Sequence, residues 1–283
     1  MSRVIDLHTH SSVSDGTETP VRLVASAIES GLAAVALTDH DSTAGWTEAA
    51  DAARGSALTV IPGMEFSTMF GWKSVHLLAY LFDPSDAGIV AETARIRDSR
   101  LRRAENIVSR ISADYDLSWS DVLEQTSRGA TVGRPHIADA LVARGLVANR
   151  SAAFESILHP RSGYFEPHYA PDPLTAVKLV VAAGGVPVLA HPGTRGASEV
   201  IPESKLKALV GAGLFGLEIE HRDNTASGKQ RLRELATTFG LATTGSSDYH
   251  GAGKPNRLGE NHTDPRVLER IIERGTGSAP LSA

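Results

Sequence analysis

Histidine and carboxylate residues recur in this sequence where short apolar runs end. The first run, Val4 to Leu7, is followed directly by His8 and His10, and Asp15 comes soon after. Residues two apart in a β-strand point to the same side of the strand, so both imidazole rings can face one point. Imidazole and carboxylate groups at one point are typical ligands of divalent metal ions. An HxH pair alone fits a hydrogen-bonded polar edge equally well, so its meaning depends on its neighbours.

The same residue types accompany the other apolar runs. In order, they are Asp39, His40 and Asp41 in LTDHDS, Glu65 in PGMEFS, His76 in SVHLLAY, His191 in VLAHPG, Glu218, Glu220 and His221 in LEIEH, and Asp248 and His250 in SDYHG. A single histidine beside a strand is more often a hydrogen-bonded rim residue, and an aspartate can simply cap a turn. It is harder to explain why so many of these residues occur together at the ends of apolar runs. Burying many imidazoles and carboxylates together without a cation removes their hydration and brings like charges close. The histidines at 8, 10, 40, 76, 191 and 250, with the carboxylates at 15, 65 and 248, therefore predict a metal centre.

Seven apolar runs are expected to form the strands that position these residues. They cover residues 4–7, 33–38, 58–62, 74–82, 186–190, 216–220 and 241–245. Helix signals lie between them, such as a start at Thr19–Pro20 that runs to Gly31 and a start at Asp172–Pro173 that runs to Gly184. This alternation predicts an α/β fold of parallel βαβ units, namely a distorted (β/α)7 barrel. Functional residues of such a barrel gather at the carboxyl ends of its strands.

One region interrupts the alternation. Between about Ala94 and Tyr169 there are three helix-like patterns, at 93–112, 135–144 and 152–158, and no convincing strand. We therefore expect a discontinuous barrel domain of residues 1–95 and 170–283, with residues 96–169 as a helical insertion over the barrel mouth. The alternative is that these helices only extend the outer ring of the barrel.

Composition limits the classes of protein to which the chain can belong. Its 283 residues are 41% hydrophobic and 22% charged, which is typical of a globular protein with a sizeable core. The net charge of −5 disfavours broad adhesion to nucleic acid, so no stable duplex partner is expected. The absence of cysteine excludes disulfides, thiolate metal sites and thiol catalysis. No apolar run suits a membrane span and no signal peptide is apparent, so a soluble cytoplasmic protein is expected.

Six motifs, taken in order, resemble the metal-ligand motifs of the polymerase and histidinol phosphatase (PHP) superfamily. They are DLHTHSSVSDG, LTDHDS, the PGxE turn at Gly63–Glu65, the lone His76, AHPG and SDYHG, and they span residues 3–95 and 172–262. The insertion carries GRPHIA at Gly133–Ala138. With this insertion, the chain is similar to small bacterial phosphoesterases that act on nucleoside 3′,5′-bisphosphates, nucleoside monophosphates or short oligonucleotides.

The resemblance implies that nine residues hold three divalent metal ions. The first ion would be held by His8, His10, Glu65 and Asp248, the second by the bridging Glu65 with His76 and His191, and the third by Asp15, His40 and His250. Mn²⁺ and Fe²⁺ are favoured, with Zn²⁺ as an alternative, because the ligands are imidazoles and carboxylates without thiolates. Such ions neutralise phosphate charge and lower the pKa of bound water, so we expect a metal-activated hydroxide to attack a phosphomonoester.

Residues outside the metal centre are expected to bind the substrate. Arg134 and His136, at the start of a helix in the insertion, could grip a second phosphate, and Arg134 is also a candidate catalytic residue. Arg100 and Arg103 share a helix face and could reach a nucleotide phosphate. His221 could donate a proton to the leaving group or orient a metal ligand. The alternatives are a structural arginine, a surface histidine and a solvated charged face.

We therefore expect the protein to bind a small phosphorylated substrate, and these arginines favour a nucleotide. One alternative is a phosphatase for another small metabolite, such as histidinol phosphate. A second is a non-catalytic, metal-stabilised binding domain, which the complete ligand set disfavours. The sequence does not indicate an oligomeric state.

Overall fold

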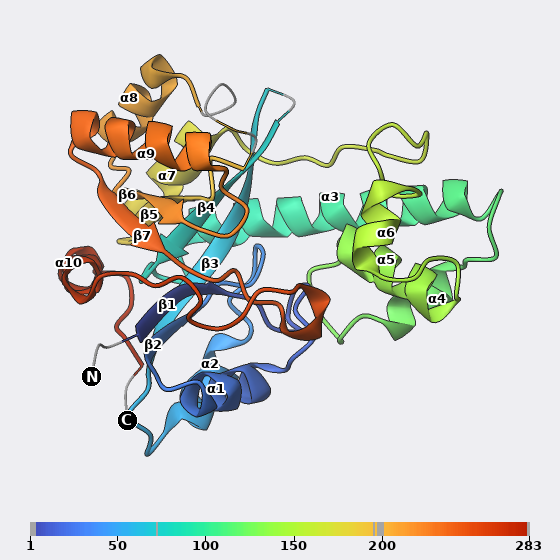
Figure 1. Ribbon diagram of the computed structural model, residues 1–283, viewed down its shortest axis with the longest axis horizontal. Helices are drawn as coiled ribbons and strands as arrows, with labels where there is room; N and C mark the ends of the chain where they lie inside the picture. Colours follow the sequence, from blue (N-terminus) through green and yellow to red (C-terminus); the bar gives the residue numbers. More distant parts are fainter. Residues whose placement is uncertain (1–3, 72, 195, 197–200, 282–283) are drawn as a thin grey trace.

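A curved seven-stranded sheet forms the centre of the computed structural model, which describes residues 4–71, 73–194, 196 and 201–281 (Figure 1). Its strands pair in chain order: β1 (Val4–Thr9), β2 (Leu32–Leu37), β3 (Thr59–Phe70), β4 (Lys73–Tyr80), β5 (Val186–Ala190), β6 (Gly216–Glu220) and β7 (Ala242–Gly245). The peptide N–H of His10, just after β1, donates to the carbonyl of Tyr249, just after β7, at 2.8 Å. The sheet is therefore a nearly closed barrel, which confirms the predicted distorted seven-stranded α/β fold.

β4 departs from the parallel arrangement expected from the alternation. It runs antiparallel to both β3 and β5, whereas the other neighbouring strands are parallel. The physical reason is the short connection between Phe70 and Lys73, because a tight turn can join only antiparallel strands. The first residues of β4 therefore lie at the rim where the parallel strands end. His76 pairs in register with Ala190, the residue before His191.

The described part of the chain also forms helices, most of which cover the outside of the barrel. They are α1 (Pro20–Glu29), α2 (Trp46–Ala53), α3 (Ala87–Ile111), α4 (Trp119–Glu124), α5 (Arg134–Ala143), α6 (Arg150–Glu155), α7 (Pro173–Ala182), α8 (Glu203–Gly211), α9 (Ala226–Phe239) and α10 (Pro265–Arg274), with a 3₁₀ turn, η2, at Gly251–Gly253. The side chains of Thr19 and Asp172 accept hydrogen bonds from the first turns of α1 and α7. Both predicted helix starts are confirmed. No helix in the described part of the chain is long and apolar enough to cross a membrane.

The long helix α3 connects the barrel to the group of helices α4, α5 and α6. Its first half buries Ile89 and Ile96 in the barrel core, and its second half buries Ile107 and Ile111 in a separate core shared with α4, α5 and α6. Figure 1 shows these three helices at the far end of α3 from the sheet. Because α3 passes residue 95 without a break, the division of the chain at residues 95 and 170 stays a prediction.

Candidate metal centre and active-site cavity

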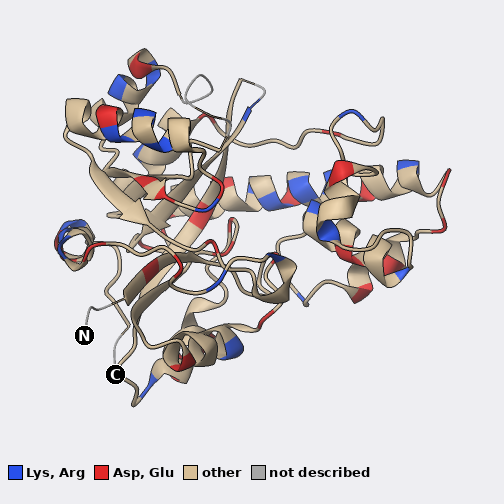
Figure 2. Ribbon diagram, in the orientation of Figure 1, with Lys and Arg blue, Asp and Glu red and all other residues tan. Residues whose placement is uncertain are grey.

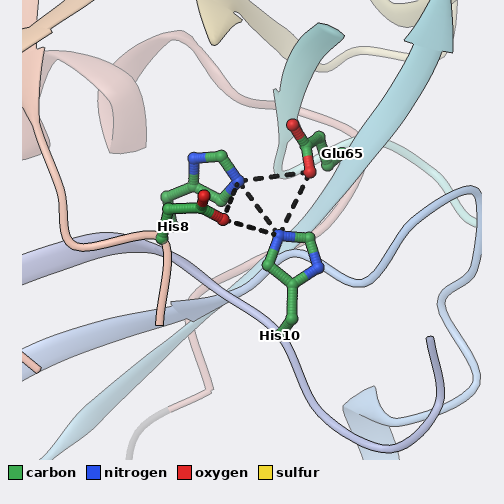
Figure 3. A group of neighbouring side chains, drawn as sticks. His8, His10 and Glu65 are labelled. Carbon is green, nitrogen blue, oxygen red and sulfur yellow. Dashed lines mark hydrogen bonds and ion pairs between the residues drawn. The ribbon is translucent and has the colours of Figure 1, made fainter. Parts of the chain in front are cut away.

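Four buried ligand atoms converge at the rim of the barrel. His8 lies in β1, His10 directly follows it, Glu65 lies in β3, and Asp248 follows β7. The Nε2 atoms of His8 and His10 are 3.1 Å apart (Figure 3). From Glu65 Oε2, these two nitrogens lie at 3.3 and 3.1 Å, and from Asp248 Oδ1 at 3.4 and 3.3 Å. The predicted ligands of the first metal ion thus face one point.

These separations suit a tetrahedral cation site. Nitrogen and oxygen ligands about 2.0–2.2 Å from a tetrahedral ion lie roughly 3.3–3.6 Å from one another. The Nδ1 atom of His8 is 3.0 Å from Glu218 Oε1, so the N–H at that position donates a hydrogen bond to the carboxylate. The Nε2 atom of a neutral His8 ring is then an unprotonated ligand atom. The donor set, its burial and its spacing all fit a divalent ion.

The other carboxylate oxygen of Glu65 faces the predicted ligands of the second ion. Oε1 lies 2.7 Å from Nδ1 of His76 and 3.2 Å from Nε2 of His191. His191 and Asp248 have φ angles of 30° and 56°, respectively. These are left-handed conformations that residues other than glycine adopt at a cost and that cluster at functional sites. The two oxygens of Glu65 thus face different predicted ligands, so Glu65 would contribute to both the first and the second ion site.

Asp15 joins the predicted ligands of the third ion. Its Oδ1 lies 3.2 Å from Nε2 of His250, and its Oδ2 lies 3.7 Å from Nε2 of His40. Nδ1 of His10 is 3.5 Å from Asp15 Oδ1, so this group adjoins the first one. All nine residues predicted as metal ligands therefore lie in one cluster.

Some buried atoms of this cluster lack hydrogen-bond partners in the described part of the chain. They are Nδ1 of His40, Nε2 of His250 and Oδ1 of Asp248. His40 and His250 belong to the third ligand group and Asp248 to the first. These atoms lie 3.2–3.4 Å from neighbouring ligand atoms without hydrogen-bond geometry, and unsatisfied polar atoms in a protein interior cost free energy. Cations at these positions would satisfy them.

The charges of the cluster shift its pKa values strongly. Burial lowers the pKa of the His8 ring, but Glu218, Glu65 and Asp248 outweigh that effect and raise it well above its ordinary value. Burial raises the pKa of the Asp248 carboxyl, but Lys254 and neighbouring histidines hold it well below its usual range. Buried carboxylates thus create a negative potential that attracts positive charge.

Three supporting residues were not among the predicted site residues. Glu218 in β6 contacts His8 and also accepts the peptide N–H of His191 at 2.9 Å. Asp39 accepts hydrogen bonds from the peptide N–H and hydroxyl of Ser11 and from the Ser14 hydroxyl, at 2.8, 2.7 and 2.6 Å. Lys254 places Nζ 2.6 Å from Asp248 Oδ2. Glu218 lies within an apolar run and Asp39 follows one, so the rule that located the ligands also points to them. Lys254 lies in a loop with no such signal.

A cavity of about 400 Å³ opens beside the cluster. Its lining includes His76, His191, Asp248, Lys254 and, from the helical insertion, Arg134. The guanidinium of Arg134 packs near the rings of Phe154 and Phe165, with distances of 5.3 and 5.4 Å to their centres. A ligand in this cavity can therefore contact the histidine and carboxylate cluster and Arg134 together.

Further arginines lie on the adjoining part of α3, which is rich in basic residues (Figure 2). Arg100 is paired, because its Nε is 3.1 Å from Asp41 Oδ2. Arg103 is buried and donates to Nδ1 of His168 at 2.8 Å, and no carboxylate of the described residues forms an ion pair with it or with Arg134. Burial, together with Arg100 and Arg134, lowers the pKa of the Arg103 guanidinium. The Nε of Arg103 and the Nε2 of His168 are buried without hydrogen-bond partners.

His136 and His221 lie outside the lining of this cavity. The Nδ1 of His136 accepts the peptide N–H of Gly133 at 3.1 Å, and its ring lines a second cavity. His221 is fully buried, with Nε2 3.5 Å from Asp248 Oδ2 and Nδ1 accepting the peptide N–H of Asp223. The structure therefore brings Arg134 to the cavity and places His221 behind a candidate ligand.

Comparisons with known proteins agree with this site. The PHP domain model matches residues 6–129. The chain is 32% identical over 275 residues to a 3′,5′-nucleoside bisphosphate phosphatase of Chromobacterium violaceum, with 94% of each chain covered. It is 32% identical to a phosphoribosyl 1,2-cyclic phosphate 1,2-diphosphodiesterase of Eggerthella lenta (87% of this chain, 94% of that one). It is 30% identical to a 5′-3′ exoribonuclease of Haemophilus influenzae (92% and 95%).

A solved structure is similar over almost the whole chain. It is a protein from Bifidobacterium adolescentis assigned as a metal-dependent phosphoesterase, with a TM-score of 0.92, 42% sequence identity and 98% of each chain covered. The similarity includes the helical insertion as well as the barrel, because the uncovered part is only a few residues.

Proposed function

We propose that this chain, which belongs to the PHP family and is a metal-dependent phosphoesterase, removes a phosphate from a small nucleotide. The relatives act on different phosphate esters, so the substrate has to be inferred from this chain's own cavity. A nucleoside 3′,5′-bisphosphate fits best, because one phosphate can lie at the histidine and carboxylate cluster while the second lies at Arg134. A nucleoside monophosphate or the end of a short oligonucleotide is the next candidate.

Three divalent ions, Mn²⁺ or Fe²⁺ with Zn²⁺ as an alternative, would occupy the three ligand groups described above. When bound, they would neutralise the charge of the phosphate and supply an activated water. Glu65 would link the first two groups, because its two oxygens face His10 and His76 separately. The chain's own part of the reaction is to hold these ligands in fixed orientations and to place the ester beside them.

The second phosphate is proposed to bind at the unpaired cations of the insertion and α3. Arg103 and Arg134 have no carboxylate partner among the described residues, and His168 presents a buried Nε2–H with no acceptor. Burying cations without counter-ions is unfavourable, so these groups are suited to an anion supplied by the substrate. Arg134 lines the cavity, and the charge of Arg103 acts on Arg134 from nearby; this excess of positive charge is the observation that carries the nucleotide proposal. The charge of Arg100 is already paired with Asp41.

In this proposal, His221 and His136 hold neighbouring groups in position and do not contact the substrate. A fully buried ring 3.5 Å from Asp248 is suited to orienting that carboxylate and not to contacting a leaving group in the cavity. Lys254 is the nearer candidate for a substrate contact, because it lines the cavity and carries a positive charge.

Phosphate release from a matched substrate panel tests this proposal. The Mn²⁺-loaded protein is assayed with adenosine 3′,5′-bisphosphate, adenosine 5′-monophosphate, adenosine 3′-monophosphate, a short 5′-phosphorylated oligonucleotide, a ribose cyclic phosphodiester and histidinol phosphate. The highest kcat/KM is expected for the bisphosphate. A preference for histidinol phosphate or the cyclic diester would overturn the assignment to small nucleotides, and release from none would overturn the phosphoesterase activity at this site.

A further inference from the structure

The helical insertion holds three consecutive residues of the loop that carries Asp15. The peptide N–H of Thr131 donates to the carbonyl of Val13 at 2.9 Å. The ring of His136 faces the backbone of Ser14, which partly offsets the lowering of its pKa by burial. Nη1 of Arg150 donates to the carbonyl of Asp15 itself at 3.0 Å. The helical insertion thus contacts residues 13, 14 and 15 of the loop between β1 and α1.

Of these three groups, Arg150 is itself held in place by an ion pair. Its Nε and Nη2 atoms each lie 2.5 Å from one carboxylate oxygen of Asp139 in α5, which is a bidentate ion pair. Its guanidinium also passes against η2, where a side chain on Gly253 would collide with Nη1. The group therefore lies between the loop that carries Asp15 and the loop that carries His250.

The loop that carries Asp15 is also joined directly to the loop that carries His250, because the peptide N–H of Thr17 donates to the carbonyl of His250 at 3.1 Å. Asp39 anchors Ser11 and Ser14, but the carbonyl of Asp15 is bound by Arg150. The Asp15 carboxylate in turn lies 3.2 Å from His250 Nε2. A shift of the Asp15 backbone would change the geometry of the third ligand group, while the ligands of the first two groups lie in or soon after β1, β3, β4, β5 and β7.

We propose that Arg150 is a positioning residue for the third cation, and that it couples docking of the helical insertion to occupancy of the group formed by Asp15, His40 and His250. This inference rests on the proposed metal centre. The Arg150 charge is balanced by Asp139, so Arg150 does not repel a cation there as a free guanidinium would. The planar guanidinium donates in fixed directions to three acceptor atoms at once, and the single ammonium group of a lysine cannot reproduce this geometry.

Metal titration of the chelator-treated full chain tests the coupling. Mn²⁺ binding is followed by the loss of free Mn²⁺ signal in electron paramagnetic resonance for the natural protein, Arg150→Met, Arg150→Lys and the control Arg144→Met. Arg144 lies at the end of α5, and within the described residues its side chain pairs with Asp116 and Asp121 of the same insertion. We expect Arg150→Met to weaken one of three sites by about 10-fold or more, with the other two unchanged. Arg150→Lys should restore part of the loss, and Arg144→Met should bind like the natural protein.

A second measurement tests the reverse direction of the coupling. In the natural protein, saturating Mn²⁺ should slow amide hydrogen exchange at Thr131 and in α5, and Asp139→Asn should reduce that protection while the barrel strands keep theirs. Three sites of unchanged affinity in Arg150→Met would overturn the inference, even if activity fell. Absence of Mn²⁺ binding to the natural protein would instead overturn the metal centre itself. If Arg150→Met fails to fold, the exchange result for Asp139→Asn decides the question.

Discussion

His8 and Glu218 form a hydrogen bond of 3.0 Å between positions 210 residues apart in the chain. The second oxygen of Glu218 accepts the peptide N–H of His191. One buried carboxylate therefore orients a ring in the first ligand group and the backbone of a ligand in the second. Partners of this kind fix the tautomer of a ligating histidine and increase its affinity for a metal.

Replacing Glu218 should weaken metal binding without changing the ligands. Glu218→Gln keeps the volume of the side chain but removes the charge that orients His8. We expect metal affinity to fall by about 10- to 100-fold, measured by Mn²⁺ titration. Glu220→Gln is the matched control, because Glu220 lies in the same strand and contacts Lys229 and Arg233 instead. Equal affinities for both variants would contradict the role of Glu218.

Replacing a ligand of the second group should remove a metal ion and abolish turnover. In His76→Asn or His191→Asn, the Glu65 oxygen that faces both rings loses one partner. We expect metal content to fall by about one ion per chain and kcat to fall roughly 10³-fold or more, with an unchanged circular dichroism spectrum. The exposed His262 provides the control His262→Asn. Normal turnover in either ligand variant would remove that residue from the proposed set.

Replacing Arg134 should discriminate between substrates with one and two phosphates. Loss of a charge-assisted hydrogen bond is worth about 1.5–3 kcal/mol, so Arg134→Ala should raise KM for adenosine 3′,5′-bisphosphate roughly 10- to 100-fold. KM for a monophosphate should change much less. The exposed Arg102, next to Arg103 on α3, provides the control Arg102→Ala. An equal rise for both substrates would contradict a role at the second phosphate.

His168 should make the stability of the protein sensitive to mild acid. Burial, with the positive charges of Arg100 and Arg103, lowers the pKa of its ring far below the ordinary 6.5. The unfolded chain therefore binds a proton near pH 6.5 that the folded chain does not, so this contribution to the unfolding free energy is present above pH 6.5 and lost as the pH falls. Between pH 7.5 and 5.5 the loss is about 1.4 kcal/mol.

Denaturant unfolding of the metal-loaded protein at these two pH values measures this effect. His168→Gln should show a smaller decrease in unfolding free energy than the natural protein, whereas His262→Gln should show the same decrease. If the decrease in His168→Gln matched that of the natural protein, the ring would not be held neutral by its surroundings.

The strands and the ligand cluster could be predicted from the sequence because each depends on a local pattern. Apolar runs marked all seven strands, and the polar residues that follow them meet at one rim because the strands pair in order. His76 fits this rim only because β4 is reversed, which the short connection after Phe70 imposes. If β4 were parallel to its neighbours, His76 would lie at the opposite end of the barrel.

The supporting contacts could not be predicted, because they depend on register and on long-range packing. Glu218 and Glu220 are two residues apart, so strict alternation places both on one face. A register irregularity between them leaves Glu218 buried and Glu220 at the surface. Likewise, the pairing of Arg100 with Asp41 and the fastening of Asp15 by Arg150 join segments whose spacing in the sequence carries no signal.

The number of metal ions per chain tests the central claim most directly. The protein is stripped with a chelator, reloaded with Mn²⁺, freed of excess ion and measured by elemental mass spectrometry, and the same sample is assayed for phosphate release from adenosine 3′,5′-bisphosphate. We expect three ions per chain, with activity that returns as they bind. Fewer than one retained ion per chain, or full activity in the stripped protein, would contradict the claim that this cluster is a metal centre for phosphate ester hydrolysis.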